Sequence, residues 1–158
     1  MKRAVAFWLG PLAAATFNFG GNFGSSFGAN TAAAACSVRI PLGLAFGTYD
    51  VFSPQDRLGA GSIEVTCDQP FSITMSAGAN SNDYRARRML GPSGYLAYNL
   101  YSDVNRLTLW VDSSDSTHAV SGSGTGLAES FDVYGLIPAG QNASVVTYTD
   151  SVLVLVTF

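Results

Sequence analysis

The chain has 158 residues, of which 47% are hydrophobic and only 12% are charged, and its formal net charge is -3. This length suits one domain with a substantial core. The acidic balance argues against nucleic-acid binding, which requires clustered Lys and Arg. Arg85, Arg87 and Arg88 do cluster, but we expect them on a solvated loop. So few charges leave a surface that suits a polymer subunit, covered by its neighbours, better than a soluble monomer.

The first fifteen residues have the pattern of a secretory leader. Lys2 and Arg3 form a positive start, residues 4–12 (AVAFWLGPL) are a short apolar run, and three alanines at 13–15 supply the small residues of a cleavage site. The apolar run is too short to cross a bilayer, so we predict no transmembrane segment. We expect residues 1–15 to be a signal peptide that is removed after its last alanine, and the protein to be exported.

The next segment alternates between aromatic and small polar residues. Phe17, Phe19, Phe23 and Phe27 all fall on odd positions, and Asn, Gly and Ser fill the even positions between 17 and 28. A period of two is typical of a strand with one apolar face. The composition also suits a flexible tether or a strand within its own domain. We favour a strand that inserts into a preformed groove, and we assign residues 16–35 as a donor strand and linker.

Cys36 and Cys67 are the two cysteines of the chain. An exported protein can keep a disulfide, and we expect this pair to be bonded. The bond would close a loop of about thirty residues and stabilise the fold by about 3 to 4 kcal/mol in the chain-entropy model. A metal site would need more ligands than two thiols and the single His118, so we assign no metal and no cofactor. A lipoprotein anchored through Cys36 fits poorly, because this cysteine lies far from the apolar run.

Short alternating runs separated by turn signals fill the remainder of the chain. They cover residues 39–46, 62–67, 71–75, 95–101, 106–111, 129–137, 144–148 and 151–158. Residues 122–126 (GSGTG) indicate a flexible loop between two of these runs. About seven short strands at such spacing predict an all-β sandwich of immunoglobulin type, without the Trp and Cys spacing of an antibody domain.

The last run, residues 151–158 (SVLVLVTF), is apolar on both faces. An apolar strand at a sheet edge aggregates unless another strand lies beside it. We expect one face of this run to line a groove left by a missing strand, and the odd-numbered phenylalanines of another copy to fill that groove. The lining residues are then Val152, Val154, Val156 and Phe158, or their odd-numbered neighbours. The pattern predicts a building block rather than an enzyme.

Several segments, taken in order, resemble the spore coat protein U domain. They lie between Cys36 and Phe158 and include FGTYD at 46–50, GSIEVTC at 61–67, LAYNLYSD at 96–103, YGLIPAGQ at 134–141 and YTDSV at 148–152. The resemblance implies that residues 36–158 form an incomplete immunoglobulin-like sandwich, which lacks its last strand and is completed by donor-strand exchange. Val146 and Val111 depart from the family pattern, in which Gly is usual near both places.

The family includes the pilin subunits of archaic chaperone-usher pili, which are thin adhesive fibres of Gram-negative bacteria. For this chain the resemblance implies a structural subunit of an extracellular pilus used in adhesion and biofilm formation. Its partners would be a periplasmic chaperone, an outer-membrane usher and other copies of itself. It would pass through the periplasm to a fimbrium at the cell surface.

Two other classes of function stay open beside this one. A secreted, monomeric β-sandwich could present aromatic side chains to a carbohydrate or a host surface. Its candidate platform is Tyr95, Tyr98, Tyr101 and Trp110. The third class is a coat or matrix protein, which would share the exchange of strands but need no chaperone. Self-association separates a pilin from a monomeric binding module.

Motifs for catalysis and metal binding are weak. Residues 24–28 (GSSFG) match the G-x-S-x-G pattern, but they lie in a low-complexity arm without the strand and helix that a nucleophile elbow needs. Asp112, Asp115 and His118 are close together in the sequence, without the spacing of a calcium loop. We therefore predict a solvated turn there.

Overall fold

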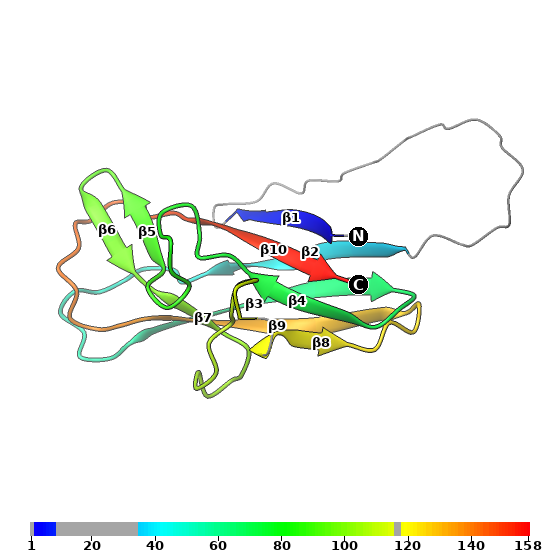
Figure 1. Cartoon of the computed structure of the whole chain (residues 1–158). Helices are drawn as coiled ribbons and strands as arrows, with labels where there is room; N and C mark the ends of the chain where they lie inside the picture. The colour runs from blue at the N-terminus through cyan, green and yellow to red at the C-terminus, as the bar shows by residue number, and fades with distance from the viewer. Residues whose placement is uncertain (1, 9–34, 116–117) are drawn as a thin grey trace, which may run out of the picture.

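The computed structural model describes residues 2–8, 35–115 and 118–158. Over these ranges the chain forms β-strands and turns, with no α-helix. The strands make two four-stranded sheets and a separate two-stranded hairpin, and all neighbouring strands are antiparallel. Figure 1 shows that the long strands of both sheets run along the length of the molecule. The prediction of an all-β sandwich is confirmed.

The first sheet has the strand order β1-β10-β4-β8. Its members are β1 (Lys2–Trp8), β4 (Phe71–Met75), β8 (Val120–Gly122) and β10 (Ser151–Thr157). The last strand of the chain is therefore not at the edge of this sheet. It lies between β4 on one side and the first strand of the chain on the other, as the red and dark blue arrows of Figure 1 show.

The second sheet has the strand order β2-β3-β9-β7. Its members are β2 (Cys36–Ala45), β3 (Arg57–Cys67), β7 (Asn99–Tyr101) and β9 (Ala128–Ile137). The central strands β3 and β9 pair along ten positions, from Arg57↔Ile137 to Thr66↔Ala128. The hairpin consists of β5 (Arg88–Gly91) and β6 (Gly94–Ala97).

The hydrophobic core contains buried residues from strands of both sheets. Side chains at alternate positions of the strands are buried because successive residues of a strand point to opposite faces. They include Ile63 and Val65 of β3, Ile73 and Met75 of β4, Val133 and Ile137 of β9, and Val152, Val154 and Val156 of β10. Trp110, which is 1% exposed, belongs to the same cluster. Burying each large apolar side chain is worth about 1.5 to 3 kcal/mol.

A pair of glycines makes room for an aromatic ring in this core. Gly59 and Gly135 are direct cross-strand partners in β3 and β9. A Cβ on Gly59 would lie 2.9 Å from the Phe46 ring, and a Cβ on Gly135 would lie 2.6 Å from it. The buried ring of Phe46 also meets Tyr98 edge to face, with 5.9 Å between ring centroids. The bare backbone at both glycines therefore lets Phe46 lie directly on the sheet.

Some strand predictions are wrong. Residues 144–148 contain a bend at Val145 and Val146 and no strand, and residues 106–111 pair only through an isolated bridge between Leu109 and Tyr101. The predicted strand 95–101 is split into β6 and β7, because its two halves pair with different strands. Tyr98 still donates its backbone N–H to Arg87 O at 3.0 Å, in the register of β5 and β6, whereas Asn99–Tyr101 pair with β9. The strands β5 and β8 had no counterpart in the prediction, and β8 ends at Gly122, in the segment expected to be a loop.

Arg87 is buried, so the expectation that it lies on a solvated basic loop is wrong. Its side chain is 0% exposed, and its guanidinium uses all five N–H groups as donors. The acceptors, at 2.8 to 3.0 Å, are the backbone oxygens of Ser76, Tyr84, Met75 and Trp110 and the side-chain oxygen of Asn99. Burial lowers the pKa of Arg87 to about 10. Arg87 thus ties the end of β4 to the segment that carries Trp110.

Candidate strand-acceptor groove

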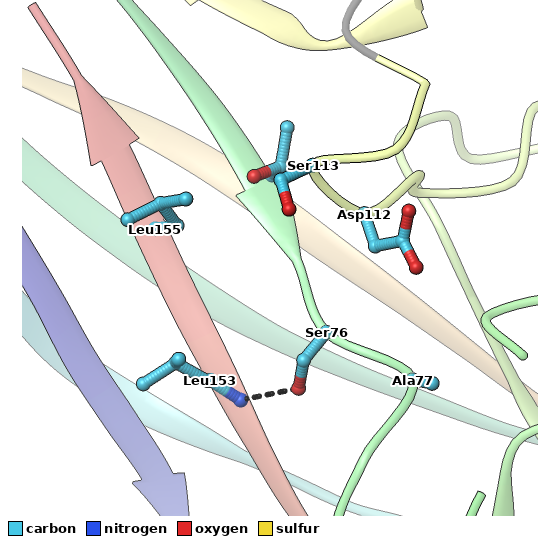
Figure 2. A pocket seen from close by; sticks show the side chains of 7 residues that line it. Ser76, Ala77, Asp112, Ser113, Leu153 and Leu155 are labelled. Atoms are coloured by element: carbon cyan, nitrogen blue, oxygen red, sulfur yellow. Dashed lines mark hydrogen bonds between the residues drawn. The ribbon is translucent and has the colours of Figure 1, made fainter. Parts of the chain in front are cut away.

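The inner face of β10 is part of the core. Val152, Val154 and Val156 are 2%, 0% and 1% exposed, and Phe158 packs half-buried against the same cluster. The alternate residues Leu153 and Leu155 point to the outer face and line a small pocket (Figure 2). The strand therefore carries apolar side chains on both faces, while its even-numbered residues belong to the core.

One edge of β10 is occupied by β4. The two strands pair from Val154↔Met75 to Thr157↔Ser72. Beyond the ladder, Ser76 donates its backbone N–H to Leu153 O at 2.9 Å, and Leu153 N–H donates to Ser76 Oγ at 2.9 Å (dashed in Figure 2). The backbone groups of successive strand residues point to opposite neighbours. Because those of Leu153 point toward β4, those of Val152 and Val154 point toward the opposite edge.

The opposite edge is filled by β1 over its full length. The register runs from Lys2↔Thr157 to Trp8↔Ser151. Residues 2–8 belong to the segment that we expected to be a removable leader, and here they are a strand of the sheet. The expected donor residues Phe17, Phe19, Phe23 and Phe27 lie outside the described residues. The edge that the sequence analysis assigned to a strand of another copy is thus taken by a strand of the same chain.

If β1 were absent, β2, at the edge of the other sheet, would form the second wall of the candidate groove. Cys36, Val38 and Ile40 pack against the core while staying only partly buried. β1 lies close to β2 as well as to β10. The three strands lie next to one another along one side of the sandwich in Figure 1. An added strand at this place therefore covers core residues of both sheets.

A disulfide between Cys36 and Cys67 fastens the start of the β2 wall, as expected from the sequence. The two cysteines are also the first pair of the β2–β3 ladder. Just outside the ladder, Ala35 N–H donates to Asp68 Oδ1 at 3.1 Å, and Asp68 N–H donates to Ala35 O at 3.3 Å. The disulfide therefore fixes the first residue of β2 to β3. This residue comes directly after the predicted arm of residues 16–35.

The other sheet edges in the described part of the chain are poor acceptors. β7 and β8 have three residues each. β2 contains Pro41, and its register shifts between Arg39 and Leu42 and again between Leu42 and Ala45. Short strands, bulges and proline all discourage pairing with another chain. Without β1, β10 would be the long, regular and uncharged edge of the sandwich.

A buried polar cluster holds the start of β10. Asp150, the residue before this strand, is 3% exposed, and its Oδ2 accepts a 2.8 Å hydrogen bond from the hydroxyl of Tyr98. Its Oδ1 accepts hydrogen bonds from Ala79 N–H, Asn80 Nδ2 and Ser151 N–H at 2.8 to 2.9 Å. Burial, together with the nearby Asp150 carboxylate, raises the pKa of Tyr98. This cluster was not predicted from the sequence, although an aspartate just before an apolar run is a signal for it.

The aromatic platform considered for a binding module is not formed. Trp110 and Tyr98 are core residues, exposed by 1% and 3%, and Tyr101 is half-buried. Only Tyr95 of the four is well exposed, at 51%, and the guanidinium of Arg88 lies over its ring, 4.2 Å from the centroid. These side chains therefore do not present a shared surface.

The remaining motifs show no assembled site within the described ranges. Residues 24–28 lie outside them. Asp112 Oδ1 accepts a 2.9 Å hydrogen bond from Ser114 N–H, and His118 Nδ1 lies 3.0 Å from Asp115 Oδ1. In the part of the chain that the structure covers, no three His, Cys, Asp or Glu side chains are grouped as metal ligands would be. No helix in that part is long and apolar enough to cross a membrane.

The amino-acid sequence is similar to that of a known family and of a characterised protein. The family model of the Spore Coat Protein U domain matches residues 21–155. "Protein U" of Myxococcus xanthus is 36% identical over 141 residues, which are 78% of this chain and 78% of that protein.

A solved structure has the same fold. It is the complex of a chaperone and a tip adhesion subunit, CsuC-CsuE, from archaic chaperone-usher Csu pili of Acinetobacter baumannii. The match has a TM-score of 0.52 at 18% sequence identity and covers 80% of this chain and 40% of that chain. This chain thus spans less than half the length of the chain it matches, and the likeness is one of fold.

Proposed function

The chain belongs to the Spore Coat Protein U domain family, and from this premise we propose that it is a structural subunit of an adhesive surface pilus. The observation that carries the proposal is the β10 edge. This edge is long and uncharged, it borders the core, and it pairs with a strand that comes from the far end of the chain. Such an edge is what strand addition between subunits requires.

In the assembled fibre, the arm of one subunit would replace β1 beside β10 of the next subunit. The odd-numbered Phe17, Phe19, Phe23 and Phe27 would then cover the core-facing side of the groove. Each buried Phe contributes about 1.5 to 3 kcal/mol, so that several together maintain a long-lived contact. Main-chain hydrogen bonds along β10 would add to this contact. The backbone groups of Val152 and Val154, which point to that edge, are the expected partners.

The partners of such a subunit follow from the same edge. Before assembly, an exposed β10 would aggregate, so a periplasmic chaperone would cover it, and an outer-membrane usher would pass the subunit to the fibre. This fold is similar to a chain in a solved complex of a chaperone and a tip adhesion subunit, and the likeness supports a chaperone as a partner. The protein would then be exported through the periplasm and become part of a fimbrium outside the cell.

We propose a structural role without catalysis. The polar groups buried in the core support this role, because Arg87 and Asp150 are fully engaged in hydrogen bonds that join segments of the sandwich. A coat or matrix protein would share the exchange of strands. Chaperone and usher genes beside the gene for this chain would favour the pilus.

The test is to delete residues 16–30 from the exported protein. The wild-type protein should form ladders of polymers on gels of samples that were not boiled. The deletion variant should accept a strand but donate none, so that it caps wild-type polymers when the two are mixed. If both proteins are stable monomers with identical melting behaviour, the exchange of strands is wrong and a monomeric binding module becomes the better account.

A further inference from the structure

The strand that occupies the β10 edge is β1, from the predicted leader, and not the arm to which the proposed function assigns exchange. We propose that Lys2–Trp8 is an intramolecular cap. While it is attached, it fills the groove of its own chain and excludes the strand of another subunit. This inference rests on the proposed function in one respect, namely that the excluded strand is a donor.

The register of β1 suits this role. Cross-strand partners lie on the same face of a sheet. Val5 and Phe7 are opposite Val154 and Val152. The register thus places two apolar residues of β1 on the face of the sheet that the core occupies. Arg3 is opposite Val156, near the end of β10, so the charged start of the segment lies toward the end of the groove.

The cap and a donated strand exclude each other. A strand has two edges, and β4 occupies one edge of β10 from Val154 to Thr157. β1 covers the other edge along all seven of its own residues. The main-chain groups of Val154 that bond a donor are the same ones that face Val5. A second strand can therefore enter only when β1 leaves.

Tethering gives the cap an advantage over any donor from outside. A strand joined to its own groove has an effective concentration on the order of 1 mM. A donor at about 10 μM with the same intrinsic affinity would then be disfavoured roughly 100-fold. The connection, residues 9–34, can extend to roughly 85 Å, which is enough to reach any part of a domain of this size. The precursor should thus stay monomeric, and removal of the leader should allow assembly to begin.

The first part of the test asks whether β1 occupies the groove in cis. The full chain carries the double substitution Ala6→Cys and Leu153→Cys, at positions that are register partners. Mild oxidation should cross-link it within one chain, visible as a faster-migrating monomer on a non-reducing gel, with peptide mapping locating the new bond. The control pairs Leu153→Cys with Ala4→Cys, two residues out of register, and should cross-link at least about 10-fold less because disulfides need close Cα atoms. Equal yields, or cross-links only between chains, would overturn the proposal.

The second part asks whether the cap excludes a donor. A labelled synthetic peptide of residues 16–30 is offered at 10 μM to the cross-linked chain and to the Val5→Pro variant of the full chain. Val5 faces the backbone groups of Val154, so proline there removes a ladder N–H and should release the cap. The matched control is Ala6→Pro, since Ala6 pairs with Leu153, whose backbone groups point the other way. Val5→Pro should take up the peptide roughly 100-fold more than the cross-linked chain, and Ala6→Pro should lie close to wild type.

The outcomes separate the cap from the proposed function. Equal uptake by the cross-linked chain and by Val5→Pro would overturn the exclusion, even if the peptide binds well. A different outcome is that no chain binds the peptide although the in-register cross-link forms. This outcome would overturn the donor role of residues 16–30 and support the pairing of β1 with β10 in cis.

Discussion

Tyr98 and Asp150 are both buried, and the tyrosine hydroxyl donates a 2.8 Å hydrogen bond to Asp150 Oδ2. Asp150 immediately precedes β10, and its other oxygen accepts N–H groups from the segment after β4 and from the first residue of β10. The bond thus links the core to the point where β10, the proposed acceptor strand, begins. The strand that forms the groove is positioned by polar contacts at its start as well as by apolar packing along its length.

Replacing Tyr98 by Phe should lower the free energy of unfolding by about 1.5 to 3 kcal/mol, because a buried carboxylate loses a hydrogen bond. Urea denaturation with the disulfide intact measures this loss. Tyr95→Phe is the matched control, since Tyr95 is 51% exposed, and it should change stability by less than about 0.5 kcal/mol. Equal midpoints for the two variants would show that the Tyr98 hydroxyl does not support the fold.

Stability should fall in alkali partly through the same tyrosine. Burial raises the pKa of Tyr98 above its ordinary value of 10.0. Above pH 10, tyrosine therefore loses its proton in the unfolded chain but keeps it in the folded one. The stabilisation is complete below pH 10 and is lost as the pH rises, by up to about 1.4 kcal/mol per pH unit. Urea midpoints between pH 9 and 11.5 should fall less steeply for Tyr98→Phe than for wild type or Tyr95→Phe, and parallel curves would contradict the assignment.

The disulfide should make a large contribution to stability. The double substitution Cys36→Ala and Cys67→Ala should lower the free energy of unfolding by about 3 to 4 kcal/mol, because the unfolded chain regains the freedom of the loop. Equilibrium denaturation measures the loss, with Ser37→Ala, on the exposed side of β2, as the control. Mass spectrometry of exported wild-type protein should find no free thiol. Two free thiols would rule out the bond in the mature protein.

Assembly should depend on the odd-numbered face of the arm. Phe19→Asp or Phe23→Asp should weaken the polymer ladder at least about 10-fold, because a charge then replaces an apolar side chain in the groove. The same change at Asn18 or Asn22 introduces an equal charge on the opposite face and should have little effect. Densitometry of samples that were not boiled compares the four variants. Similar losses from both faces would indicate a tether rather than an inserted strand.

Local periodicity predicted the strands whose packing is regular. Residues 71–75 were predicted with the bounds that β4 has, and 151–158 and 129–137 differ from β10 and β9 by one residue. In each of these strands, alternate residues are buried over at least part of the length. Alternate burial produces the period of two in hydrophobicity from which the strands were predicted. The strand β8 has three residues and could not produce such a pattern.

Other errors came from contacts between distant parts of the chain. Arg87 is buried because carbonyl groups of several separate segments surround it, and its neighbours in sequence do not reveal them. Trp110 lies in an apolar run that periodicity reads as a strand, yet this segment is largely outside the ladders, and Arg106 at its start has a φ of 58°. The pairing of Lys2 with Thr157 joins the two ends of the described chain. Its register cannot be inferred from either segment alone.

The short β7 and β8, together with the bulged β2, limit the number of connections that a subunit can make. With β10 as the one long, regular edge among the described strands once β1 is displaced, the proposed exchange would give each subunit one place for a foreign strand. The predicted arm of residues 16–35 would be the one strand that it donates. Units with one acceptor and one donor join head to tail, which is the heterologous contact that produces open filaments. Such a fibre lengthens without branching, and every internal subunit holds its two neighbours by equivalent joints.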